Sequence, residues 1–457
     1  MKAKIKISII GFLALSVGAC VANNSNAPQT TVGPSPAASP SPTSSPVVSS
    51  TGNAQSPSAI TLAVLDALLT NENFVSDLKS KVQVTDQQLD QLKKASTDEV
   101  ARLRSNNAED SSLDTNDARS RATEQITSIL GEQKAAQFNS FVNDFWARGG
   151  ESEPAEKSSA DSIVRKPNAV PTDTRVVVNI PAYRMDLFKD GSLVKSYKIG
   201  IGYPEFPLPQ GLRKAQTIIF NPTWTPPDSP WVAKMKNVTA GEKVEAGSKL
   251  NPLGPIKIPI GMPSLIHGGK SIAKLGTFAS HGCVGLTNAQ VKDFAKVLSQ
   301  IAGTDLTDQS INSYLKDPTQ TRAVKLKQTI PVELRYETIV VEGGALHIYK
   351  DVYDQNSNTE ENLQKVLEAN GTSLDSFAED ERAKVLAALN SMSTHPKAMP
   401  SPTIEEKKDK QKRVEKKPAK NQKEIVVELK TLAGRGYPAP VNLDNGTGKS
   451  VVTATAR

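Results

Sequence analysis

The sequence predicts a multi-domain protein: a mainly β domain, an N-terminal all-α module, and partly disordered linkers and tail. Apolar residues recur at helical spacing before residue 148, short strand-like runs bounded by turns fill the middle, and Ser-, Pro- or Lys-rich stretches separate and follow them. A chain of 457 residues exceeds one ordinary domain. Its apolar fraction of 37% and its 30 prolines indicate linker or tail beside the folded parts.

The N-terminus has the features of a secretory signal. Lysines precede an apolar run at 5–17, which is shorter than the roughly 20 residues needed to span a bilayer. Val17-Gly18-Ala19-Cys20 resembles a bacterial lipobox, in which the cysteine becomes the lipidated first residue; an ordinary signal peptide cut near Ala19 is the alternative. Val21 follows instead of an aspartate, which by resemblance to Gram-negative sorting rules indicates the outer membrane. We expect a lipoprotein signal peptide at 1–20 and a disordered tether at 21–58.

The segment 59–148 is predicted to be a helical module of three or four helices. Its apolar residues recur three or four positions apart, as on the buried face of an amphipathic helix: Ile60, Val64, Leu65, Leu68, Leu69, Leu89, Leu92, Val100, Ile126, Ile129, Leu130, Phe138, Phe141 and Val142. Thr85 precedes Asp86-Gln87-Gln88 and is a candidate N-cap. A polar linker is expected at 149–174, so the module is predicted to be a separable unit.

The segment 175–354 is predicted to be the mainly β domain. Strand-like runs occur at 175–180, 185–188, 193–200, 217–220, 256–260, 329–336 and 339–341. The turn Lys189-Asp190-Gly191 lies between two of them, which is a hairpin signal. One clear helix is expected, from Gln290 to Gln300.

Beyond residue 354 we expect a helical extension at 355–400 and a basic, largely disordered C-terminal tail at 401–457. A strand-like run at 424–429 has no predicted place. The formal net charge of +7 favours anionic neighbours such as a membrane face or cell-wall polymer. No nucleic-acid partner is expected, because the chain has no aromatic-and-basic stripe or zinc-finger spacing.

The chain has two cysteines, too few for a disulfide framework, and if Cys20 is acylated then Cys283 has no partner. An unpaired thiol in an oxidising compartment is a liability unless its reactivity is used. A thiol attacks carbonyl groups as the thiolate, and a free cysteine has a pKa of roughly 8.5. We therefore expect an imidazole or a helix N-terminus to activate it. His267 and His281 lie upstream, and the predicted helix begins near Asn288.

Two glycines beside these residues favour acyl-transfer chemistry. Gly268 and Gly282 remove side chains where a substrate backbone must approach, and the amides of Gly282 and Cys283 can donate to an oxyanion. A zinc site is an alternative, but no fourth ligand is found near the histidines and Cys283. A redox cysteine is a second alternative, but no resolving partner is present.

A family resemblance adds to this interpretation. His267-Gly268 followed by Ser280-His281-Gly282-Cys283-Val284 resembles the signature of the L,D-transpeptidase (YkuD-type) catalytic domain. The resemblance continues through 179–184, 197–202, 204–207, 221–227 and 251–254, and 332–338 with 346–353 is similar to an extension of the periplasmic branch. It covers about 175 to 353, under half of the chain.

The resemblance implies a YkuD-like β-sandwich with one helix beside the catalytic cysteine. It makes Cys283 the nucleophile and His267 the general base, with the Gly268 carbonyl orienting the imidazole. Ser280, His281 and Gly282 would shape the oxyanion site. The family cleaves the bond before the terminal D-alanine of a peptidoglycan tetrapeptide stem through a thioester, which an amine then attacks. It implies no metal and no organic cofactor, peptidoglycan stem peptides as partners, and a periplasmic location, here with a lipid anchor in the membrane.

One position departs from the family pattern. The family usually has arginine two residues after the cysteine, where this chain has Gly285. Lys270, Lys274 and Arg213 are candidates to replace it. Two rival functions stay open: an L,D-carboxypeptidase, in which water resolves the thioester, and a catalytically decayed peptidoglycan-binding lipoprotein.

Overall fold

The structure of the protein is a computed structural model that describes residues 60–105, 114–147, 166–227, 232, 235–393 and 422–448. The expected signal peptide with Cys20, the tether and the lysine-dense part of the tail lie outside these ranges. All described residues belong to one compact unit, Ser56–Arg457. None of the described helices is both long enough and apolar enough to cross a membrane.

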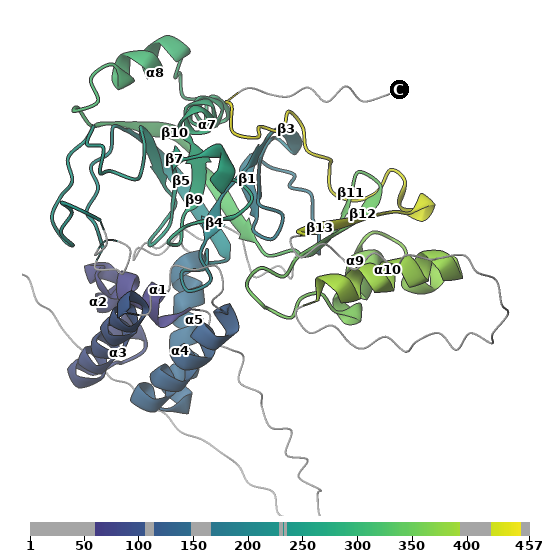
Figure 1. The fold of residues 1–457 in the computed structure, drawn as a ribbon, viewed down its shortest axis with the longest axis horizontal. Coiled ribbons are helices and arrows are strands. Elements are labelled where there is room, and N and C mark those ends of the chain that lie inside the picture. The colour runs from purple at the N-terminus through teal and green to yellow at the C-terminus, as the bar shows by residue number, and fades with distance from the viewer. Residues whose placement is uncertain are drawn as a thin grey trace, which may run out of the picture. The chain divides into compact units, whose positions relative to one another are not determined.

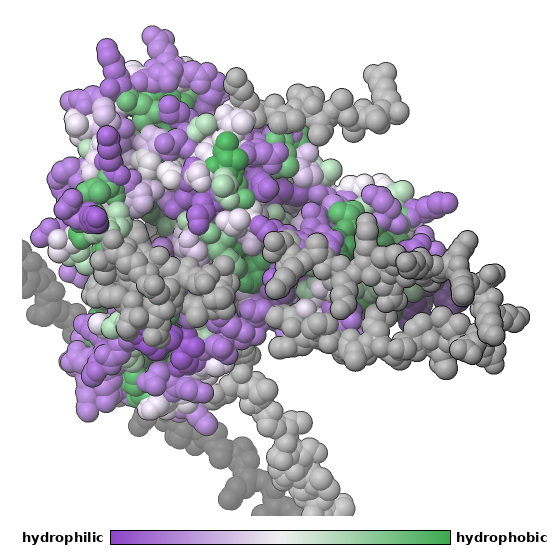
Figure 2. Space-filling model, viewed as in Figure 1, coloured by the Kyte–Doolittle hydropathy of each residue, from purple (hydrophilic) through white to green (hydrophobic). Residues whose placement is uncertain are grey.

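The helical module is confirmed and has five described helices instead of three or four: α1 (Leu62–Leu69), α2 (Glu72–Lys81), α3 (Asp86–Ser105), α4 (Thr115–Leu130) and α5 (Glu132–Ala147). Thr85 caps α3 as predicted, because its hydroxyl accepts from the Gln88 N–H while the Gln88 side chain accepts from the Thr85 N–H. Phe74, Phe138 and Phe145 are fully buried in the module's core. The outer face of these helices seen in Figure 2 is mostly hydrophilic.

An eight-stranded sheet forms the strand-rich domain (Figure 1), in the order β3-β2-β1-β10-β5-β6-β7-β9. Its strands are β1 (Arg175–Asn179), β2 (Arg184–Lys189), β3 (Ser192–Lys198), β5 (Gly211–Phe220), β6 (Ile256–Pro259), β7 (Leu265–Lys270), β9 (Val284–Thr287) and β10 (Arg322–Arg335). The pairs β1–β10 and β7–β9 are parallel, and the other neighbours are antiparallel. Two shorter strands, β4 (Ile201–Gly202) and β8 (Phe278–Ser280), pair separately in parallel. This architecture confirms the predicted mainly β domain.

The predicted hairpin joins β2 and β3. Asp190 and Gly191 have φ values of 48° and 79°, and a two-residue type I′ turn needs two left-handed residues in succession.

The predicted helix is α7 (Asn288–Ile301). It begins with a capping box between Thr287 and Gln290. Its face with Phe294 and Leu298 packs into the same core as Ile266 of β7. A second helix, α8 (Asp308–Leu315), was not predicted; it is short, and Ile311 is its buried residue.

A smaller sheet lies beyond the large one along the chain. It contains β11 (Ile339–Glu342), β12 (Ala345–Tyr349) and β13 (Glu424–Glu428), and packs against α9 (Glu360–Ala369) and α10 (Glu379–Met392) around a separate core. The run at 424–429 thus pairs with β12. The structure differs here from the expected tail, because residues 422–448 form defined contacts; the Asp444 carbonyl accepts from the Lys198 N–H and the Gln290 side chain.

The helical module contacts the segment 203–208 of the strand-rich domain, so the structure differs from the expected separable unit. The Thr61 hydroxyl donates to the Glu205 carbonyl (2.7 Å) and the Thr115 hydroxyl donates to the Pro204 carbonyl (3.0 Å). Phe206 packs against a cluster of buried residues on α1 and α3, which includes Leu103. The module therefore holds both the backbone and the ring of this segment.

Four charged side chains strengthen this contact. Arg121 of α4 donates to Glu99 (3.0 Å) and Glu205 (2.9 Å), and Arg102 of α3 lies 2.6 Å from Glu99 and 3.8 Å from Glu205. Burial raises the pKa of Glu205 despite the two arginines. Burial acts the same way on Glu99, but its shorter contacts with both arginines outweigh it and lower its pKa.

Candidate active site

Two adjacent parallel strands place the predicted histidine and cysteine on the same face of the sheet. In the β7–β9 pair, Ile266 is opposite Val284 and His267 is opposite Gly285. Ile266 and Val284 face the hydrophobic core. Side chains alternate along a strand, so His267 and Cys283 lie on the opposite face of this pair. The sheet topology thus brings together two residues that are distant in the sequence.

The His267 imidazole is buried and has a defined orientation. Its Nδ1 lies 2.7 Å from the Gly268 carbonyl oxygen, the contact that the family resemblance implies. A carbonyl only accepts hydrogen bonds, so Nδ1 carries the proton and Nε2 is the basic nitrogen in the neutral ring. Burial, with the charge of Lys270, lowers the pKa of His267 to about 3. The ring is therefore neutral at physiological pH.

The Cys283 thiol is free and its environment differs from the expectation. Burial raises the pKa of Cys283, while a hydrogen bond from the Leu265 backbone and the charges of Lys270 and Lys257 act in the opposite direction. We expected an activated, easily ionised thiol. The resting site instead holds a neutral thiol beside a neutral imidazole, because desolvation outweighs the two ammonium groups.

The loop 280–283 is fixed by two serine hydroxyls. Ser280 Oγ accepts from the Cys283 N–H (3.0 Å) and donates to the Cys283 carbonyl. Ser264 Oγ donates to the Gly282 carbonyl (2.8 Å). The Gly282 N–H has no hydrogen-bond partner among the described residues, whereas the Cys283 N–H is already engaged. Of the two amides expected to serve an oxyanion, only that of Gly282 is free to donate.

His281 connects this loop to the segment that the helical module holds. Its ring centroid lies 4.9 Å from that of Phe206 and 5.1 Å from that of Tyr203. Burial lowers the pKa of His281 to about 3, so this ring is also neutral. His281 therefore packs between aromatic rings and shapes the loop through van der Waals contact.

Gly268 and Gly282 are glycines for different reasons. A Cβ at Gly268 would lie 2.9 Å from Val291 Cγ1 and 3.0 Å from Asn288 Oδ1, so the close approach of α7 excludes a side chain there. Gly282 has a φ of 89° and open space around its Cα. Only Gly282 fits the expectation of a glycine that leaves room for a substrate.

Lys270 fills the space beside Gly285. A Cβ at residue 285 would lie 2.9 Å from Lys270 Cγ and 3.1 Å from its Cε, so the lysine side chain runs across the glycine. The Lys270 ammonium interacts with the Cys283 thiol. Of the three candidates for the missing arginine, Lys270 lies beside Gly285 and near Cys283. Arg213 is fully buried elsewhere, with its guanidinium 5.1 Å from the centre of the Trp146 ring.

His347 is not part of this site, because it pairs with Glu424 across the small sheet. His395 and Trp231 lie outside the described residues. In the part of the chain that the structure describes, no cluster of three or more His, Cys, Asp or Glu side chains could hold a metal ion.

Sequence reasoning missed three residues of the site. Ser264, Lys257 and Phe206 act through contacts between segments far apart in the chain. Of the three, only Lys257 lies in a strand that the sequence predicts, at 256–260. In the structure it is the cross-strand partner of His267.

Residues 175–335 form a strand-rich domain in which the loop with Cys283 leads through β9 into helix α7. Residues 173–320 match the family model of the YkuD L,D-transpeptidase catalytic domain. Proteins with this domain are cysteine-dependent acyltransferases of the cell envelope that act on peptidoglycan stem peptides.

Solved L,D-transpeptidase structures are similar to part of the chain. The catalytic domain of an E. faecium L,D-transpeptidase is 17% identical over 36% of this chain and 100% of that chain, with a TM-score of 0.23. An L,D-transpeptidase from Mycobacterium tuberculosis is 14% identical over 35% of this chain and 57% of that one (TM-score 0.21). L,D-transpeptidase 3 from the same organism, in complex with a faropenem-derived adduct, is 13% identical over 35% and 60% (TM-score 0.22). The match spans less than two thirds of both mycobacterial chains. No curated protein matches the chain.

Proposed function

We propose that this protein is a peptidoglycan L,D-transpeptidase in which Cys283 is the nucleophile and His267 the general base. The observation that carries the proposal is the pairing of β7 with β9 inside the YkuD region, which sets both residues on the same face of the sheet. The neutral imidazole with Nδ1 bonded to Gly268 supports the role of His267, because Nε2 is then able to accept the thiol proton.

In the first half-reaction, Cys283 Sγ attacks the carbonyl carbon of the peptide bond before the terminal D-alanine of a tetrapeptide stem. The thiol proton passes to His267, a tetrahedral oxyanion forms, and its collapse breaks the C–N bond. His267 returns the proton to the leaving amine, which releases D-alanine and leaves a thioester. In the second half-reaction an amine of another stem attacks the thioester and regenerates the thiol.

The pKa values of the resting site shape the expected order of these steps. Burial lowers the pKa of His267 to about 3 and raises that of Cys283, so transfer of the proton without substrate is strongly unfavourable. We therefore expect proton transfer to accompany the attack. Lys270 and Lys257 would stabilise the negative charge that develops, and the free Gly282 N–H would donate to the oxyanion.

We further propose that the chain is lipid-anchored at Cys20 in the cell envelope, in the outer membrane. The support is the lipobox-like Val17-Gly18-Ala19-Cys20 and the Val21 that follows it. Detergent phase partitioning of the native protein and of a Cys20→Ala variant tests this proposal. Equal partitioning of both into the aqueous phase would overturn it.

Intact-protein mass spectrometry after incubation with a disaccharide-tetrapeptide tests the reaction. We expect a covalent adduct on the native protein with release of free D-alanine, and neither product with Cys283→Ala. Circular dichroism must show that the variant is folded. A fully active Cys283→Ala variant, or a folded native protein that forms no adduct, would contradict the proposal and favour the binding lipoprotein. Product masses separate transfer to an amine from hydrolysis, and hence the transpeptidase from the L,D-carboxypeptidase.

A further inference from the structure

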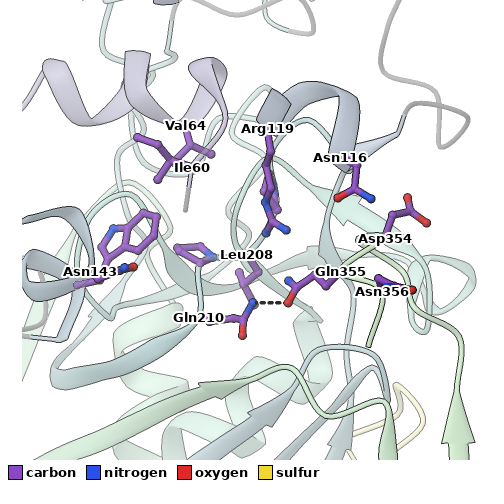
Figure 3. Close-up of a pocket in the computed structure, with 13 residues that line it drawn as sticks. Ile60, Val64, Asn116, Arg119, Asn143, Leu208, Gln210, Asp354, Gln355 and Asn356 are labelled. Atoms are coloured by element: carbon purple, nitrogen blue, oxygen red, sulfur yellow. Dashed lines mark hydrogen bonds between the residues drawn. The ribbon is translucent and has the colours of Figure 1, made fainter. Parts of the chain in front are cut away.

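A second cavity lies away from Cys283, between the helical module and the strand-rich domain (Figure 3). Its volume is about 460 Å³, within the range of small-molecule sites. Residues of α1, α4 and α5 line one side, and residues 207–210 and 354–356 line the other. Neither His267 nor Cys283 is among its lining residues, so it is separate from the candidate active site.

Three buried hydrogen-bond donors on the wall of this cavity have no partner among the described residues: Arg119 Nε, Trp146 Nε1 and Gln355 Nε2. Arg119 extends from its helix toward Leu208 and Gln355 in Figure 3. A buried donor without a hydrogen-bond partner is unfavourable, and more so when it is charged. Three such donors around one cavity indicate a ligand rich in acceptor atoms.

The charge of the wall favours an anionic ligand. Burial lowers the pKa of Arg119, and Asp351 and Asp354 oppose this only in part. No described carboxylate accepts a hydrogen bond from its Nε. A second cation, Arg213, stacks on the Trp146 ring and has two further buried donors, Nε and Nη1, without a described partner. Asp354 is the one acidic residue that lines the cavity.

We propose that this cavity binds the carboxylate of an N-acylated amino acid or short peptide. A carboxylate offers two oxygens that a guanidinium can bind in a bidentate manner, with capacity left for the indole and amide N–H groups. The acyl portion would pack on the apolar wall that Ile60, Val64 and Leu208 form. The proposal does not depend on the reaction at Cys283.

The position of the cavity connects it to the active-site loop. Pro207 and Leu208 line the cavity, and the preceding residue, Phe206, packs against His281. A ligand that contacts 207–210 would reduce the motion of this segment. Hydrogen exchange of residues 203–210 is therefore a readout of binding that does not require activity.

The test is isothermal titration calorimetry on the mature chain with N-acetyl-D-alanine, with N-acetyl-D-alaninamide as the neutral match and inorganic phosphate as a different anion. We expect millimolar or tighter binding of the carboxylate, slower exchange at 203–210, and binding of the amide at least about tenfold weaker. Arg119→Gln is expected to weaken carboxylate binding by about tenfold or more, since it removes the bidentate charged donor.

Control variants separate this site from folding and from the reaction. Arg382→Gln, at an exposed arginine on α10, is expected to bind as the native chain does. Trp146→Phe keeps an aromatic ring, smaller than the indole, and removes one donor, so weaker binding with an unchanged thermal midpoint would support a direct contact. Cys283→Ser is expected to bind normally even if the proposed reaction fails.

Several outcomes would overturn the proposal. These are equal binding of the acid and its amide, tighter binding of phosphate than of the carboxylate, and no effect of Arg119→Gln in a folded protein. If no probe binds at millimolar concentration, the cavity holds only solvent and the proposal is also wrong.

Discussion

Lys270 and Gly285 are sterically complementary. The glycine leaves the space through which the lysine chain passes, and the ammonium reaches the environment of Cys283. Lys270 therefore brings a cation to the surroundings of the thiol from the neighbouring strand. The departure at residue 285 therefore does not by itself indicate a decayed site.

Replacing Lys270 by methionine tests this role. Methionine keeps an unbranched chain over Gly285 and removes the charge that stabilises the thiolate, so the pKa of Cys283 should rise further. We expect alkylation of Cys283 by iodoacetamide to shift to higher pH and kcat/KM at neutral pH to fall about tenfold, which is about 1.4 kcal/mol. Lys292→Met, at an exposed lysine on α7, is the control. An unchanged alkylation profile in Lys270→Met would contradict the role.

At the scale of elements, the segment 203–208 contacts both the helical module and the loop that contains Cys283, so it connects the two. One end of it is held by Glu205 between Arg102 and Arg121, and the adjacent Phe206 contacts His281. Glu205 is 2% exposed, so its charge depends on these partners.

Glu205→Gln is expected to loosen this segment. It leaves two arginines facing Glu99 alone, and should lower the free energy of unfolding by about 2 kcal/mol in a urea titration. Alkylation of Cys283 should become faster, because the thiol is less well buried. The matched variant Glu245→Gln removes an exposed partner of Lys243 and should change stability by less than about 0.5 kcal/mol. Equal unfolding midpoints for the two variants would refute the role of Glu205.

At the scale of the whole molecule, the helical module is part of the structure that surrounds the active-site domain. It covers Glu205, Phe206 and the fully buried Arg213, and it supplies one wall of the second cavity. Its removal would expose a guanidinium and an aromatic ring that the strand-rich domain does not cover on its own.

Deletion of residues 59–148 is therefore expected to lower both stability and activity. A loss of the contacts of Phe206 and Arg213 should reduce the thermal midpoint by about 5 °C or more. The proposed transpeptidase activity should fall with it, because His281 loses its support. Deletion of residues 24–57, in the predicted tether, is the control and should leave both unchanged. A module deletion that melts and reacts like the full chain would show that the module is a passive spacer.

Local patterns were sufficient for several features. The capping box at Thr85, the hairpin at Asp190–Gly191 and the helix after residue 287 depend on residues within a few positions of one another, and all three are present. Extended strands such as β10 were recognised only in part, since their exposed halves lack the apolar alternation. Residues 422–448 were expected to be tail, because their contacts are with strands and helices far earlier in the chain.

The composition of the site can be read from the sequence: a His-Gly pair, a Ser-His-Gly-Cys run and a helix that follows, within a region of strands. How these residues are charged and what surrounds them depends on the folded chain. Burial keeps the thiol and imidazole neutral, Lys270 occupies the space beside Gly285, and the helical module holds the segment that packs on His281. Motifs record which groups are close in the chain, whereas desolvation, charge pairing and close packing depend on segments that only the folded chain brings together.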